Sequence, residues 1–212
     1  MPALESIAES LHRDLEARTA ARDRALAHAR QLVRACAHAI RAVHRGDREQ
    51  TAERLAAART LADALRTDLA AFPELYYAGY TQDALKEFAE ASIVAALVDG
   101  GDLPTPAGLG IPASAYVRGL AEAVGELRRR VLDLLRHGHS PEVERLLGVM
   151  DDIYAVLVTM DYPDAVTLGL RRLTDIARSL LERTRGDVTL SLRQQSLEDA
   201  LQRIEAQVRP SA

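Results

Sequence analysis

The chain has 212 residues, of which 48% are hydrophobic, 4% aromatic and 27% charged, and its formal net charge is −4. No stretch reaches the roughly 18 apolar residues that a membrane span needs, and acidic and basic residues interrupt the N-terminus where a signal peptide would carry an apolar core. The single cysteine, Cys36, excludes an internal disulfide and fits a reducing compartment. We therefore expect one all-α domain over residues 1–212, located in the cytoplasm, with no membrane partner.

Glycine and proline are sparse outside one loop at 99–112, so the expected helices are long. Gly46 is expected to end the first helix, and Ser140 with Pro141 to begin the fifth. Helices are predicted over residues 3–45, 47–71, 82–98, 113–137, 140–161, 163–186 and 187–208, with a short connection or one more turn at 76–80. The pattern therefore predicts about seven helices and no sheet.

The segment 87–98 is apolar on almost every side, yet it contains Glu87 and Glu90. A helix with this composition is a buried helix, and residues three apart share a face. Ala91 and Val94 continue that face, so we expect it to point inward. Two buried like charges are costly, and they require compensation by arginines or by a cation.

The segment 113–127 repeats this situation, because its only charges are Arg118, Glu122 and Glu126, spaced by four. Gly119 and Gly125 are unfavourable inside a helix, which indicates close approach of a neighbouring helix at these positions. Helices joined by one loop are usually neighbours in space, so the four glutamates of the two segments are expected to converge.

Clustered carboxylates without histidine are hard oxygen ligands, which suit Mg²⁺ or Mn²⁺, and such ions support phosphodiester hydrolysis. A network of Arg118 with the glutamates, serving only to orient helices, is the competing interpretation. A di-iron bundle would need Glu-x-x-His on two helices. The sequence has that spacing only at Glu9 and His12, on a helix face expected to meet water.

A basic stripe is predicted on the first helix. From Arg24 to Arg45 there are five arginines, three histidines and no acid. Four of these arginines fall within a sector of about 60° on a helix, and we call them the arginine stripe: Arg30, Arg34, Arg41 and Arg45. The apolar residues Leu26, Val33, Cys36, Ile40 and Val43 lie to one side, as a buried face. Such stripes bind phosphate backbones, although an ordinary solvated face is the alternative. Arg59 and Arg66 on the second helix are weaker candidates for the same surface.

Four segments resemble the translin superfamily, and within it the prokaryotic proteins similar to translin-associated factor X. They span most of the chain in the family's order and read FPELYYAGY at 72–80, QDALKEFAEA at 82–91, YVRGLAEAVGELR at 116–128, and YPDA at 162–165 through ERTRGD at 182–187. The resemblance implies a seven-helix fold, assembly into a hollow homo-oligomer, most simply an octamer, and RNA or single-stranded DNA held inside. A second, non-catalytic subunit of the same superfamily is the alternative to a homomeric shell.

The translin-associated branch also implies a metal-dependent endoribonuclease. Its Glu-x-x-Glu falls on Glu87 and Glu90, and its Gly-Glu-Leu-Arg glutamate falls on Glu126. Glu122 stands where the branch usually has aspartate, which adds one methylene and keeps the ligand type. Because pure translin-like binders lack the complete acid set, the resemblance favours the enzyme. A non-catalytic nucleic-acid-binding scaffold and a purely structural helical oligomer are the alternatives.

Overall fold

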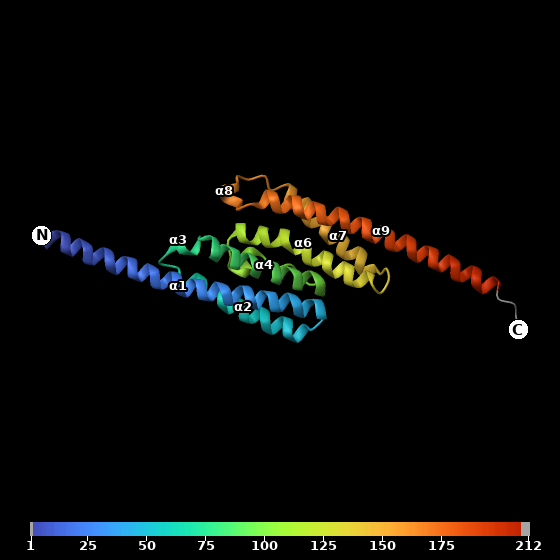
Figure 1. Ribbon diagram of the computed structural model, residues 1–212, viewed down its shortest axis with the longest axis horizontal. Helices are drawn as coiled ribbons and strands as arrows, with labels where there is room; N and C mark the ends of the chain where they lie inside the picture. The colour runs from blue at the N-terminus through green and yellow to red at the C-terminus, as the bar shows by residue number, and fades with distance from the viewer. Residues whose placement is uncertain (1, 209–212) are drawn as a thin grey trace. The chain divides into compact units, whose positions relative to one another are not determined.

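The computed structural model describes residues 2–208, and all regular secondary structure in this range is helical (Figure 1). The helices are α1 (Pro2–Arg45), α2 (Arg48–Asp68), α3 (Pro73–Tyr76), α4 (Gly79–Asp99), α5 (Pro106–Leu109), α6 (Ala113–Leu135), α7 (Pro141–Val158), α8 (Asp164–Thr167) and α9 (Leu170–Val208). The all-α prediction is confirmed. The described residues form two compact units, one from 2–96 with 102–119, the other from 97–101 with 120–208.

In the first unit, α1 and α2 pack lengthwise against each other (Figure 1). The reversal between them is built by Gly46, whose φ of +70° is open to glycine at little cost, and by Asp47, whose side chain accepts a hydrogen bond of 3.0 Å from the Gln50 backbone nitrogen. The helix end predicted at Gly46 is confirmed. The buried face of α1 is rich in alanine and includes Leu32 and Cys36.

Most of the apolar residues at 84–97, which lie in α4, are buried, as their composition predicted. Phe88, Ile93 and Val94 are almost wholly inaccessible to solvent. The start of α6 crosses α4 closely at Gly119, where an added Cβ atom would lie 2.8 Å from the Lys86 carbonyl oxygen. The close approach expected at Gly119 is confirmed. At Gly125 an added Cβ would make only an ordinary contact of 3.8 Å with Leu180, so that glycine does not mark a tight crossing.

In the second unit, α7 packs along α9, and α9 is one continuous helix (Figure 1). The sequence predicted a break at Gly186 with Asp187 as the cap of a further helix, and the structure contradicts this. Gly186 keeps a helical conformation, and the Asp187 carboxylate pairs with Arg128 at 2.8 Å instead of capping. The predicted helices 163–186 and 187–208 are therefore α8 followed by α9.

The N-terminal part of α1 and the C-terminal part of α9 extend beyond the other helices of their own units (Figure 1). Each carries a row of exposed aliphatic side chains at helical spacing: Leu4, Ile7, Leu11 and Leu15 on α1, and Leu190, Leu197, Leu201 and Ile204 on α9. No helix among residues 2–208 combines the length and the apolar character needed to cross a membrane.

Candidate metal centre and nucleic-acid interface

The structure brings together three of the four glutamates predicted to converge. Glu87 and Glu90 lie on α4 and Glu122 on α6, and each offers a carboxylate oxygen within 4.8 Å of those of the other two. We call these three residues the acid cluster. Glu90 is buried, with 8% of its surface exposed, while Glu87 and Glu122 are half-buried. In the part of the chain that the structure describes, this is the only such group of potential metal ligands.

Arg118 was the basic residue expected to pair with the glutamates, but two ion pairs near the acid cluster join other partners. Arg118 pairs with Asp83, at 2.7 Å between Nη2 and Oδ1. Lys86 places its ammonium group 3.0 Å from the Glu87 carboxylate and is itself nearly buried. The sequence pattern alone did not predict a role for Lys86. Its identity as the single lysine of the chain, directly before Glu87, was the available signal.

The carboxylates of the acid cluster affect the pKa of a residue on α1. Cys36 of α1 is fully buried, and this burial raises the pKa of its thiol. The carboxylates of Glu87 and Glu90 raise that pKa further, because they disfavour a second nearby anion. Cys36 is therefore held as an uncharged thiol, which agrees with a core role and argues against a nucleophile.

Glu126, the fourth predicted ligand, is not a member of the acid cluster. Its carboxylate lies 3.9 Å from the guanidinium group of Arg129 on the next turn of α6. Glu9 and His12, the spacing weighed for a di-iron site, are both exposed on the N-terminal part of α1. The described residues therefore reduce the candidate metal ligands to the three glutamates.

The acid cluster fits a hard divalent cation by its chemistry. All three ligand groups are carboxylates, with neither histidine nor a thiolate among them, which is the donor set typical of Mg²⁺ and Mn²⁺. Carboxylates this close repel one another, and a bound cation would relieve that repulsion. The Lys86 ammonium group beside Glu87 already relieves part of it.

The arginine stripe is exposed along its whole length, and within residues 2–208 none of its four members pairs with a carboxylate. Its positive charge affects His38 on the same helix. Partial desolvation lowers the pKa of His38 below its ordinary value, and repulsion from Arg41, Arg54, Arg34 and Arg45 lowers it further. The stripe is thus a region of positive potential, as phosphate binding requires.

Arg59 and Arg66 have other partners. Arg59 donates a hydrogen bond of 2.9 Å to the Gly108 carbonyl oxygen and lies over the Phe88 ring, with 5.2 Å from its guanidinium carbon to the ring centroid. Arg66 pairs with Asp63 at 2.8 Å. Both side chains are occupied within the first unit, so the candidate interface consists of the arginine stripe.

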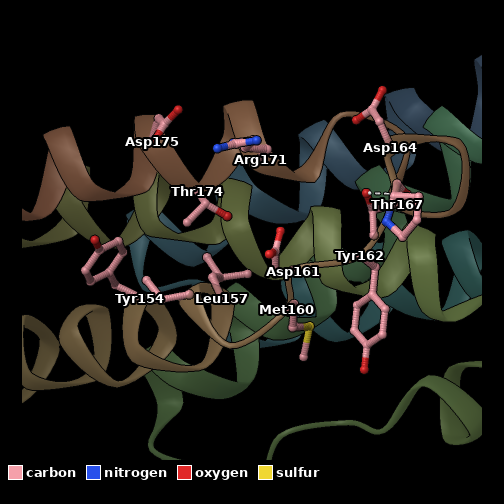
Figure 2. A pocket seen from close by; sticks show the side chains of 12 residues that line it. Tyr154, Leu157, Met160, Asp161, Tyr162, Asp164, Thr167, Arg171, Thr174 and Asp175 are labelled. Atoms are coloured by element: carbon pink, nitrogen blue, oxygen red, sulfur yellow. Dashed lines mark hydrogen bonds between the residues drawn. The ribbon is translucent and has the colours of Figure 1, made fainter.

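A cavity of about 790 Å³ lies in the second unit, between the end of α7, α8 and the start of α9 (Figure 2). Its wall includes Tyr162, Pro163 and Asp164, which belong to the segment 162–165 that carries part of the family resemblance. There Asp164 accepts a hydrogen bond of 2.8 Å from the Gly169 backbone nitrogen, at the turn where Leu168 has a φ of +52°. The aspartates of this cavity do not form a metal-ligand group. The motif therefore forms the turn that precedes the first residue of α9.

Comparison with known proteins agrees with this architecture. No protein-family model matches the chain. An uncharacterized protein of Methanocaldococcus jannaschii, MJ0175, is 33% identical over 188 residues, which cover 87% of this chain and 82% of that protein. The crystal structure of AfC3PO is similar with a TM-score of 0.79 and 30% identity, covering 88% of this chain and 97% of that one.

A structure of AfC3PO in complex with duplex RNA gives a TM-score of 0.80 and 31% identity, covering 88% of this chain and 96% of that one. Apo-NeC3PO, at 17% identity and a TM-score of 0.77, covers 90% of this chain and 98% of its own, and it supports the fold alone. An all-helical chain with this degree of likeness to C3PO structures is a protein of the translin type. The chain belongs to the translin superfamily.

Proposed function

We propose that this chain binds RNA or single-stranded DNA along the arginine stripe and cleaves RNA with the help of Mg²⁺ or Mn²⁺ held by the acid cluster. The observation that carries the proposal is the convergence of three carboxylates from α4 and α6 within 4.8 Å. The duplex RNA complex of AfC3PO, a relative at 31% identity, supports an RNA ligand.

The residues of the chain divide the work. The arginine stripe holds the phosphate backbone, since guanidinium groups form paired hydrogen bonds with phosphate oxygens. Glu87, Glu90 and Glu122 are the ligands for the cation, which would supply an activated water and stabilise the leaving oxygen. Lys86 lies beside Glu87 at 3.0 Å and limits the repulsion within the acid cluster before the cation binds.

The family resemblance implied that Glu126 is a fourth acidic site residue, but we do not propose it as a metal ligand. Because its carboxylate lies near Arg129 and outside the acid cluster, we assign it a positioning role at most. A Glu126→Gln variant should therefore keep more activity than variants of the other three glutamates.

A non-catalytic scaffold is the second candidate, and the Lys86–Glu87 pair favours it, because an ammonium group is a structural alternative to a metal. The two are separated by incubating the purified protein with labelled single-stranded RNA, with Mn²⁺ and with EDTA. Cleavage that requires Mn²⁺ and stops in EDTA supports the enzyme. Binding without cleavage under both conditions leaves the scaffold.

We further propose that the chain assembles into a homo-oligomer, most simply an octameric shell. The exposed aliphatic rows on α1 and α9 support this, because rows of this length on protruding helices are costly in water unless a partner covers them. Light scattering of the purified chain is the test. A monomer at micromolar concentration would contradict the proposal and would point to a second, different subunit.

A further inference from the structure

A groove of about 500 Å³ runs beside the arginine stripe in the first unit. Its lining is mostly aliphatic and comes from α1, with one aromatic residue from the start of α4: Leu26, Ala29, Val33, Ala37 and Tyr80, with Arg30 and Arg34. The volume lies within the roughly 300–1,000 Å³ typical of small-molecule pockets. The groove therefore joins an apolar floor to two members of the arginine stripe.

Val33, which lines this groove, was predicted to be buried but is exposed. The helical pattern placed it on the buried face of α1, but 39% of its surface is exposed. The neighbouring Leu32 and Cys36, by contrast, are fully buried. An exposed valine between two arginines offers an apolar surface to a ligand that also carries negative charge.

Tyr80 contributes the polar feature of the groove. Its hydroxyl group is buried and has no hydrogen-bond partner within the described chain. A buried hydroxyl in that state is unfavourable, so a ligand with a donor or acceptor at this point would be stabilised. The aromatic ring itself is a suitable stacking surface for a planar group.

We propose that this groove receives one unpaired nucleobase of an RNA strand whose phosphates are held by Arg30 and Arg34. The proposal rests on the proposed RNA binding and adds the substrate feature that is recognised. A nucleotide matches the groove in each respect: the phosphate is anionic, the base has apolar faces, and its edge carries donors and acceptors. A base within a duplex cannot enter, because its edge and faces are already engaged.

The position of the groove connects it to the acid cluster. Tyr80 and Glu87 lie on the same face of α4, seven residues apart. At 1.5 Å per residue this is about 10 Å along the helix axis. A base held in the groove would therefore place a neighbouring phosphate of the same strand close to the acid cluster.

The test compares single-stranded with duplex RNA of the same sequence, both fluorescently labelled, by anisotropy in EDTA, so that cleavage does not interfere. Ala37→Leu fills the groove without changing charge, and Ala57→Leu, at an exposed site on α2, is the matched control. Ala37→Leu should weaken single-stranded binding by roughly tenfold, the size expected for removing one stacked base, and leave duplex binding unchanged. Arg34→Gln should weaken both, and Ala57→Leu neither.

Equal affinity of Ala37→Leu and wild type for single-stranded RNA, or an equal weakening for both RNAs, would overturn the groove while leaving the proposed RNA binding intact. Failure of the wild-type protein to bind either RNA at low salt would overturn both. If circular dichroism shows that Ala37→Leu loses helix, Tyr80→Phe decides. This variant removes only the hydroxyl group and should lower single-stranded affinity by roughly threefold, with the duplex affinity constant.

Discussion

Gly119 of α6 lies so close to Ala89 of α4 that a Cβ atom at position 119 would be 2.6 Å from the Ala89 Cβ. It would also be 2.8 Å from the backbone nitrogen of Glu90. Backbone atoms cannot yield as flexible side chains do, so only glycine permits this crossing. Glu122 follows on the next turn of the same helix, and its carboxylate is one of those in the acid cluster.

Gly119→Ala should therefore destabilise the protein by about 1–3 kcal/mol, the usual cost of overpacking. Gly125→Ala is the matched control on the same helix. Its Cβ would lie 3.8 Å from Leu180, and the gain in helix propensity should stabilise the protein by up to about 1 kcal/mol. Urea denaturation of both variants measures the difference. Equal unfolding midpoints would contradict a tight crossing at Gly119.

The arginine stripe predicts the salt dependence of binding. Replacing Arg30 and Arg34 with glutamine should weaken RNA binding for every sequence tested, because phosphate contacts carry no base information. The slope of log affinity against log salt concentration should flatten by about 0.7–0.9 for each phosphate group that the variant no longer binds. Arg193→Gln with Arg203→Gln, both exposed on α9, removes the same charge from another helix. An equal weakening in that control would mean that net charge alone governs binding.

His38 reports on the same surface. Its pKa is lowered by partial desolvation and by the arginines around it, chiefly Arg41, so His38 is mostly neutral at pH 7. Bound phosphates would neutralise those arginines and raise the His38 pKa toward its ordinary value. An NMR titration with and without RNA, assigned with a His38→Gln variant, measures this change. A His38 pKa that RNA leaves unchanged would place the bound strand elsewhere.

A substitution at Gly186 can test whether α9 is continuous. Gly186 has a helical backbone and nothing within 4 Å of the position of an added Cβ atom. Gly186→Ala should therefore raise the free energy of unfolding by up to about 1 kcal/mol. A destabilised variant would show that the helix breaks there, as the sequence alone suggested.

The sequence predicted the helical class and several boundaries, because Gly46 and Pro141 impose local geometry that no tertiary contact has to supply. It failed at Gly186, where a glycine that permits a helix end is kept helical, and the Arg128–Asp187 pair beside it joins residues far apart in sequence. Local propensity cannot anticipate such a contact.

In the candidate site, too, the sequence predicted some features and not others. Glu87 and Glu90 were recognisable because charges are rare on a buried helix face. The partners of Arg118 and Lys86 were not, because they depend on side-chain reach across and along α4 rather than on residue type. The exposure of Val33 was also hidden, since the periodicity of α1 does not reveal where the neighbouring helices stop covering it.

If the acid cluster holds a catalytic cation, as proposed, Glu90→Gln should remove an essential ligand, because Glu90 is the most buried of the three glutamates. Glu74→Gln, in α3 and half-exposed beside Arg18, is the matched control. Cleavage of labelled single-stranded RNA in Mn²⁺ and RNA affinity in EDTA should be measured for both variants. We predict that Glu90→Gln abolishes cleavage while retaining wild-type affinity, and that Glu74→Gln changes neither. Cleavage by Glu90→Gln at the wild-type rate would contradict a catalytic cation at the acid cluster.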